Sequence, residues 1–165
     1  MKIETARFGA LEVDPAQVFT FPMGILGFAP LKSFVVVERA RQHFKWLQSV
    51  EDASVAFVLG DPLSFYPSYR AEIKRAELNA IAPLDEHQLV LSVIMTVASS
   101  LADVSANLCA PLIFNLANRR AMQYVLNDQR YPVKHFIFRE SAAGASAPAP
   151  SNSGDRLDPR SLSLR

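Results

Sequence analysis

The chain has 165 residues, half of them hydrophobic and a fifth charged, which is typical of a single globular domain. Its net charge of +1 comes from 17 basic and 16 acidic side chains. This balance argues against sequence-independent binding of nucleic acid, because such binding needs several lysines or arginines to neutralise phosphates. The one cysteine, Cys109, has no partner for an internal disulfide, so a reducing compartment is expected.

No segment has the features of a secretion signal or a membrane helix. The first five residues contain no apolar signal core. The longest apolar run, residues 89–98, is interrupted by Ser92 and Thr96 and is shorter than the roughly 20 residues that a membrane helix needs. We therefore expect a soluble, cytoplasmic protein.

Residues 1–140 carry the pattern of a chain made of short strands. Apolar runs with β-branched residues recur at near-regular spacing between turn residues, which is typical of a β-sandwich or barrel. The predicted strands cover residues 6–13, 18–21, 34–38, 44–50, 55–59, 69–74, 89–97, 103–109 and 112–116. Between the second and third of them, residues 22–28 form a turn with one proline, two glycines and several apolar side chains.

The strand over residues 44–50 contains the only tryptophan. Phe44, Trp46 and Gln48 fall on one of its faces, and Lys45 and Leu47 fall on the other. This alternation with a period of two residues is that of a β-strand with two different faces.

One helix is predicted over residues 119–127, where apolar residues recur at i, i+3 and i+4, and Asn118 is its candidate N-cap. Arg119 and Arg120 then lie in the first turn, where the helix dipole disfavours cations. They are therefore either paired with carboxylates or used in recognition. A second, short helical turn is expected over residues 76–84.

The composition changes at the end of this domain. Residues 141–154 contain no large apolar side chain, and the remaining residues add only three leucines. Such a segment buries too little apolar surface to offset the entropy lost on ordering, so residues 141–165 are predicted to form a disordered tail. A short helix over residues 156–165, formed on a partner, is the alternative.

Signatures of enzymes are missing from the sequence. It contains no G-x-S-x-G elbow, no phosphate-binding G-x-x-x-x-G-K-[ST] loop and no H-E-x-x-H motif. The three histidines, His43, His87 and His135, are far apart and have no cysteine or carboxylate at the spacing of metal ligands. We therefore expect no catalytic residue, metal or cofactor, and a protein that binds rather than reacts.

Several local motifs occur together in one order along residues 1–140. They are FPMGILGF at 21–28, FKWLQS at 44–49, DP at 61–62 with YPSY at 66–69, and NLCAPLIFN at 107–115, followed by Arg120, Gln123 and Tyr131. In this order the motifs resemble those of the FliW family of flagellar assembly factors, which antagonise the translational regulator CsrA.

The resemblance implies a mainly β fold, compact, antiparallel and barrel-like, with one or two short helices and no catalysis. It also implies two mutually exclusive partners, flagellin and CsrA. When flagellin is exported, the freed factor binds CsrA and allosterically relieves its repression of flagellin mRNA translation. No small-molecule substrate, membrane or direct contact with nucleic acid is implied.

Interface energy usually comes from a few aromatic and arginine anchors, and polar side chains amid apolar ones need partners when buried. By these criteria the candidate partner-binding residues are Phe44, Trp46, Gln48, Tyr66, Tyr69, Asn107, Asn115, Arg119, Arg120 and Tyr131. Several have a structural alternative: the tryptophan can belong to the core, the amides can fix loops, and the arginines can be solvated or paired in salt bridges.

Two other functions remain open at this point. A flavin-binding barrel that acts as an oxidoreductase would also combine short strands with few charges, but no glycine-rich or basic phosphate loop supports it. A direct RNA binder is disfavoured by the neutral domain.

Overall fold

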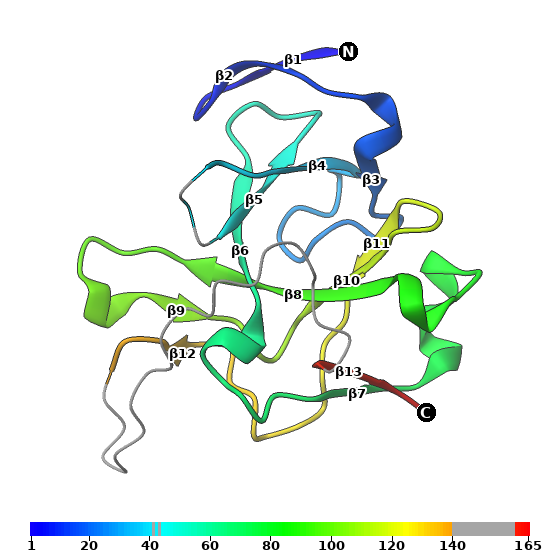
Figure 1. Cartoon of the computed structure of the whole chain (residues 1–165), viewed down its shortest axis with the longest axis vertical. Coiled ribbons are helices and arrows are strands. Elements are labelled where there is room, and N and C mark those ends of the chain that lie inside the picture. Colours follow the sequence, from blue (N-terminus) through cyan, green and yellow to red (C-terminus); the bar gives the residue numbers. More distant parts are fainter. Residues whose placement is uncertain (41, 43, 140–160) are drawn as a thin grey trace.

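The computed structural model describes residues 1–40, 42, 44–139 and 161–165. In this part of the chain, strands close into a barrel with the neighbour order β3-β4-β5-β6-β8-β10-β11 and back to β3 (Figure 1). These strands are β3 (Val18–Thr20), β4 (Ser33–Val37), β5 (Lys45–Ser49), β6 (Ala56–Gly60), β8 (Leu89–Thr96), β10 (Leu112–Asn115) and β11 (Arg120–Gln123). Every pair is antiparallel except β11 with β3, which is parallel. The predicted mainly β barrel is confirmed, and the one parallel pair makes it mixed.

Other strands attach to the outside of this barrel. β1 and β2 form a hairpin at the end drawn uppermost in Figure 1, and the parallel pair β7 and β13 lies toward the opposite end. β9 pairs with β8, and β12 pairs with β9. Their bounds are β1 (Lys2–Thr5), β2 (Gly9–Glu12), β7 (Ala71–Ile73), β9 (Ser105–Ala106), β12 (His135–Phe136) and β13 (Leu162–Leu164).

The helices that the structure describes are short 3-10 helices. They are η1 (Pro15–Gln17), η2 (Pro62–Ser64), η3 (Arg75–Ile81), η4 (Glu86–Gln88) and η5 (Leu101–Asp103). Asp14, Asp61 and Asp85 precede η1, η2 and η4, and their carboxylates accept hydrogen bonds from backbone N–H groups of the first turn. The helical turn predicted over residues 76–84 is confirmed by η3.

The helix predicted over residues 119–127 is wrong, because β11 occupies this stretch. Arg119 has a φ of 56°, in the left-handed region, and so reverses the chain after β10. Asn118 is not a helix cap: its Oδ1 accepts from the N–H of Arg120 at 3.0 Å, inside the β10–β11 turn. Pairing with β10 and β3 outweighs the helical spacing of a few apolar residues.

Two apolar clusters share the wall formed by β8 and β10. Each of the seven barrel strands contributes at least one side chain to the barrel interior, including Leu47, Val90 and Phe114. Leu91 and Ile113 point the other way, into a second cluster covered by segments after β6 and after β11. β8 is thus buried on both faces, which explains its nearly continuous apolar sequence.

The prediction of a disordered tail needs a correction at its last residues. Leu162–Leu164 form β13, which pairs in parallel with β7, and Ser161 is buried. This finding also replaces the alternative of a helix there. Residues 141–160 of the predicted tail lie outside the described residues, and the predicted domain boundary at residue 140 stays a prediction.

Candidate functional site

An aromatic and arginine-rich patch covers the outer face of β5. Leu47 points into the barrel and is fully buried, so its neighbour Trp46 points outward, where it is half-buried. Phe8, in the turn between β1 and β2, contacts Trp46 edge to face, with 5.7 Å between ring centroids. The Oγ1 of Thr5 fixes this turn by accepting from the N–H of Phe8 and donating to the carbonyl of Gly9.

Two guanidinium groups lie over the two rings. Cζ of Arg7 is 4.2 Å from the centroid of the Trp46 ring, and Cζ of Arg39 is 5.1 Å from that of Phe8. Nε1 of Trp46 donates to Oε1 of Gln42 at 3.3 Å. We call Arg7, Phe8, Arg39, Gln42 and Trp46 the Trp46 patch. Partly exposed tryptophan and arginine, preorganised by cation–π contact, are the side chains that most often dominate the energy of protein interfaces.

Tyr69 and Tyr131 lie in the core instead. Their ring centroids are 4.5 Å apart, and both side chains are almost fully buried. Oη of Tyr69 donates to the carbonyl of Leu108 at 2.9 Å, and Oη of Tyr131 accepts from the N–H of Arg70 at 2.9 Å. The half-buried Tyr66 packs edge-on against both rings. These tyrosines therefore fasten the segment before β7 to the barrel.

The buried phenol of Tyr69 predicts a dependence of stability on pH. Burial raises the pKa of Tyr69 above its usual range, so its contribution is complete below the pKa of an unfolded tyrosine and falls as the pH rises past it. At pH 8 we expect Tyr69→Phe to be less stable by about 1 kcal/mol, the value of one hydrogen bond. At pH 11 the native chain has lost about 1.4 kcal/mol through Tyr69, so the difference should reverse, with the native chain less stable than Tyr69→Phe by about 0.4 kcal/mol. Urea unfolding at both pH values tests this, and an equal difference at both would contradict it.

The predicted amides hold loops together. Nε2 of the fully buried Gln48 donates to the carbonyls of Ser49 and Val55 at 3.0 and 3.1 Å and so closes the loop between β5 and β6. Oδ1 of Asn107 accepts from the N–H of Ala110. Asn115 bonds three backbone groups near η3 and the β10–β11 turn. All three amides thus bond loop backbone, while Oε1 of Gln48 is buried without a hydrogen-bond partner among the described residues, and a role of these amides in partner binding stays a prediction.

The remaining candidates are dispersed. Cζ of Arg119 lies 5.0 Å from the centroid of the Phe19 ring, and Nη1 of the exposed Arg120 donates to the carbonyl of Ala80 at 3.4 Å. Phe44 is half-buried just before β5. Of the predicted contact residues, only Trp46 thus belongs to the Trp46 patch, and the tyrosines, amides and arginines lie elsewhere.

Sequence reasoning missed two exposed apolar side chains in the turn over residues 21–28. Met23 and Leu26 are 70% and 66% exposed, whereas Phe21 and Ile25 are buried in the barrel interior. The N–H of Leu26 donates to Oε1 of Gln123 at 2.9 Å, which ties the turn to β11. The signal was present: a short apolar turn cannot bury all of its side chains, so alternate ones must face solvent.

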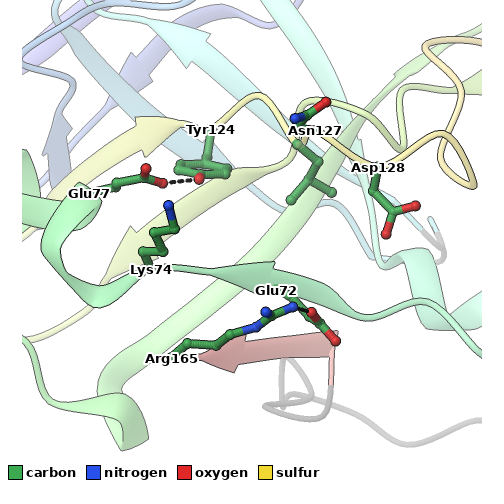
Figure 2. A pocket seen from close by; sticks show the side chains of 8 residues that line it. Glu72, Lys74, Glu77, Tyr124, Asn127, Asp128 and Arg165 are labelled. Atoms are coloured by element: carbon green, nitrogen blue, oxygen red, sulfur yellow. Dashed lines mark hydrogen bonds and ion pairs between the residues drawn. The ribbon is translucent and has the colours of Figure 1, made fainter.

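A charged cavity of about 350 Å³ lies between β7, β13 and the segment after β11 (Figure 2). Its lining residues are Glu72, Lys74, Glu77, Tyr124, Leu126, Asn127, Asp128 and Arg165. The hydroxyl of Tyr124 donates to Glu77, which raises the pKa of Tyr124 to about 12. Among the described residues no three histidine, cysteine or carboxylate side chains are grouped to hold a metal ion. Nor does this part of the chain contain a helix long and apolar enough to cross a membrane.

Known proteins resemble this chain over almost all of the barrel. The family described as FliW protein matches residues 2–137. The flagellar assembly factor FliW of Thermoanaerobacter pseudethanolicus is 36% identical over 142 residues, covering 85% of this chain and 95% of that protein. The flagellar assembly factor FliW of a Geobacillus species, strain WCH70, is 36% identical over 143 residues, covering 87% and 99% of the two chains.

A solved structure agrees with these sequence relatives. The crystal structure of a flagellar assembly factor FliW superposes with a TM-score of 0.78 at 34% identity, and the match covers 84% of this chain and 98% of that one. Fold, motif order and overall sequence thus lead to one assignment. This chain belongs to the FliW family of flagellar assembly factors.

Proposed function

We propose that this chain binds flagellin and CsrA in the cytoplasm, one at a time, and that the form free of flagellin relieves the repression of flagellin mRNA by CsrA. Membership of the FliW family is the observation that carries the proposal. The chain then acts as a chaperone-like sensor: export of flagellin frees it, and the freed protein turns on the synthesis of more flagellin.

The mechanism is thermodynamic linkage. If the chain binds CsrA away from its RNA site and weakens RNA binding, the two events share a coupling free energy, typically about 1–3 kcal/mol. Flagellin adds a second linkage, because it lowers the concentration of free chain by mass action. No covalent bond is made or broken in either step, so the chain needs binding surfaces and no catalytic group.

The experiment is a calorimetric titration of the chain with CsrA, repeated after flagellin has been bound. Saturable heat with CsrA that disappears in the presence of flagellin is the expected result. A folded sample that binds flagellin but gives no heat with CsrA would remove the regulatory part of the proposal and leave a flagellin chaperone.

We further propose that the Trp46 patch contacts one of these partners. Its support is its composition: a half-exposed tryptophan, a phenylalanine packed on its edge, and two guanidiniums placed over the rings. These side chains are already ordered in the free chain, so they lose little conformational entropy when a partner covers them. The two arginines favour a partner surface that combines apolar and acidic groups.

Replacing Trp46 with alanine is expected to weaken binding to that partner by at least about 30-fold, the effect of losing one anchor worth 2 kcal/mol. Calorimetry with CsrA and with flagellin separately measures the effect and identifies the partner. Arg7→Ala removes the stacked cation with less risk to folding and should weaken the same interaction to a smaller extent. Leu101→Ala, on the exposed helix η5, is the control. Unchanged affinity of folded Trp46→Ala for both partners would exclude the patch.

A further inference from the structure

The edge of β7 carries a strand that comes from the far end of the sequence. β13 pairs with β7 in parallel, with Leu162, Ser163 and Leu164 opposite Ala71, Glu72 and Ile73. The pairing continues past the strand: the N–H of Arg165 donates to the carbonyl of Ile73 at 3.0 Å, and the N–H of Arg75 donates to the carbonyl of Arg165 at 2.9 Å. Among the described residues β7 pairs with no other strand. Without β13, therefore, β7 presents an unpaired edge.

The side chains of this added strand fit the edge in a definite pattern. Leu162 and Leu164 pack on the second core cluster beside the fully buried Ala71 and Ile73. Arg165 extends along β7 to an ion pair with Glu72, at the wall of the charged cavity (Figure 2). The segment paired with this edge thus has two leucines two residues apart, which contact the core, followed by a basic residue that pairs with Glu72.

Of the two paired strands, the FliW family model matches β7 but not β13. β7 lies within the residues 2–137 that the FliW family matches, and β13 lies beyond them. The Geobacillus relative is covered over 99% of its length by 143 aligned residues, which are 87% of this chain. The edge of β7 therefore lies in the part of the chain that the family model matches, whereas the strand that covers it lies outside that part.

We propose that the edge of β7 is a docking site for an extended peptide segment with the pattern leucine-x-leucine-arginine, and that residues 161–165 occupy it as a built-in competitor. Addition of a strand to an open edge is a common mode of peptide recognition: main-chain hydrogen bonds give affinity, and contacts to alternate side chains give specificity. A segment tethered to the same chain competes at an effective concentration in the millimolar range, so it occupies the edge until a tighter-binding segment displaces it. This inference goes beyond the proposed function and holds whichever partner carries the segment.

The test uses the full chain and a fluorescent synthetic peptide with the sequence of residues 156–165. In Leu162→Asp/Leu164→Asp, the tethered segment can no longer seat its leucines, so the edge is vacated. We expect fluorescence anisotropy to report binding of the peptide about tenfold tighter to this variant than to the native chain. Ser163→Thr keeps both leucines and should behave like the native chain.

A charge reversal at Glu72, combined with a matching change in the peptide, tests the geometry through an exposed side chain. Glu72 is exposed, so Glu72→Lys, added to the double variant, leaves the core intact and opposes the arginine of the peptide. Glu72→Lys should weaken binding of the peptide a few-fold. A peptide with glutamate in place of its last arginine should show the reverse, and bind the chain with Glu72→Lys better than the double variant that keeps Glu72. Equal peptide affinity of the native and double-aspartate chains, or no response to the charge reversal, would overturn the proposal.

Discussion

Gly24→Ala is expected to destabilise the barrel severely, lowering the free energy of unfolding by about 4 kcal/mol. Gly24 has a φ of 70°, and an added Cβ would lie 2.5 Å from the carbonyl oxygen and 2.6 Å from the Cα of Ala29. Those are backbone atoms, so no side chain can rotate to make room. The turn cannot shift as a whole either, because Phe21 and Ile25 on both sides of the glycine are fixed in the barrel interior.

Gly27 provides a matched control in the same turn. Its φ of 84° is also in the left-handed region, but an added Cβ would meet nothing within 4 Å. Gly27→Ala should therefore cost only the backbone strain, about 1–2 kcal/mol. Urea unfolding of both variants, followed by tryptophan fluorescence and circular dichroism, measures the two values. Equal losses would mean that close approach to Ala29 is not what makes Gly24 necessary.

The sequence predicts correctly those strands and turns that a local pattern of residue types determines. The strands predicted over residues 44–50, 55–59 and 89–97 correspond to β5, β6 and β8, with ends that differ by only one residue. In each of them, β-branched or alternating apolar residues suit the half-buried surface of a sheet. The turn at 22–28 was also recognisable, because proline and two glycines interrupt the apolar runs.

The errors arose where distant pairing decides the structure. Residues 119–127 have a helical spacing of apolar side chains, but β10 and β3 recruit Arg120–Gln123 as a strand. Residues 6–13 were predicted as one strand, whereas the turn held by Thr5 makes them the second half of a hairpin that begins at Lys2. β13 carries only two leucines, and its partner lies about 90 positions earlier. No local window contains that information.

The candidate site could be predicted only where a local pattern determines it. Alternation placed Trp46 opposite the buried Leu47, and the structure agrees. Phe8 and Arg7, which also belong to the patch, lie in the turn between β1 and β2, far from β5 in sequence, so no local pattern indicates that they meet Trp46. Residue type alone made Tyr69 and Tyr131 look like contacts, but burial with a hydrogen-bonded hydroxyl is an equally good use of tyrosine. The oxidoreductase alternative is excluded because the family consists of assembly factors.

Asn115→Ala is expected to lower the free energy of unfolding by about 3 kcal/mol, because it removes three hydrogen bonds made by one fully buried side chain. Asn115 is fully buried at the end of β10. Its Nδ2 donates to the carbonyls of Ile81 and Pro83, both at 2.8 Å, and its Oδ1 accepts from the N–H of Ala117 at 3.0 Å. One side chain thus joins the end of η3 to the β10–β11 turn.

Two further variants separate hydrogen bonding from volume. Asn107 is half-buried and makes one such bond, to the N–H of Ala110, so Asn107→Ala should cost only about 1 kcal/mol. Asn115→Asp keeps the shape and the acceptor but sets a carboxylate against two carbonyl oxygens, and it should therefore be at least as unstable as Asn115→Ala at neutral pH. Chemical unfolding of the three variants gives the comparison. If Asn115→Asp retained native stability, the two donated hydrogen bonds would not be what fixes η3 on the barrel.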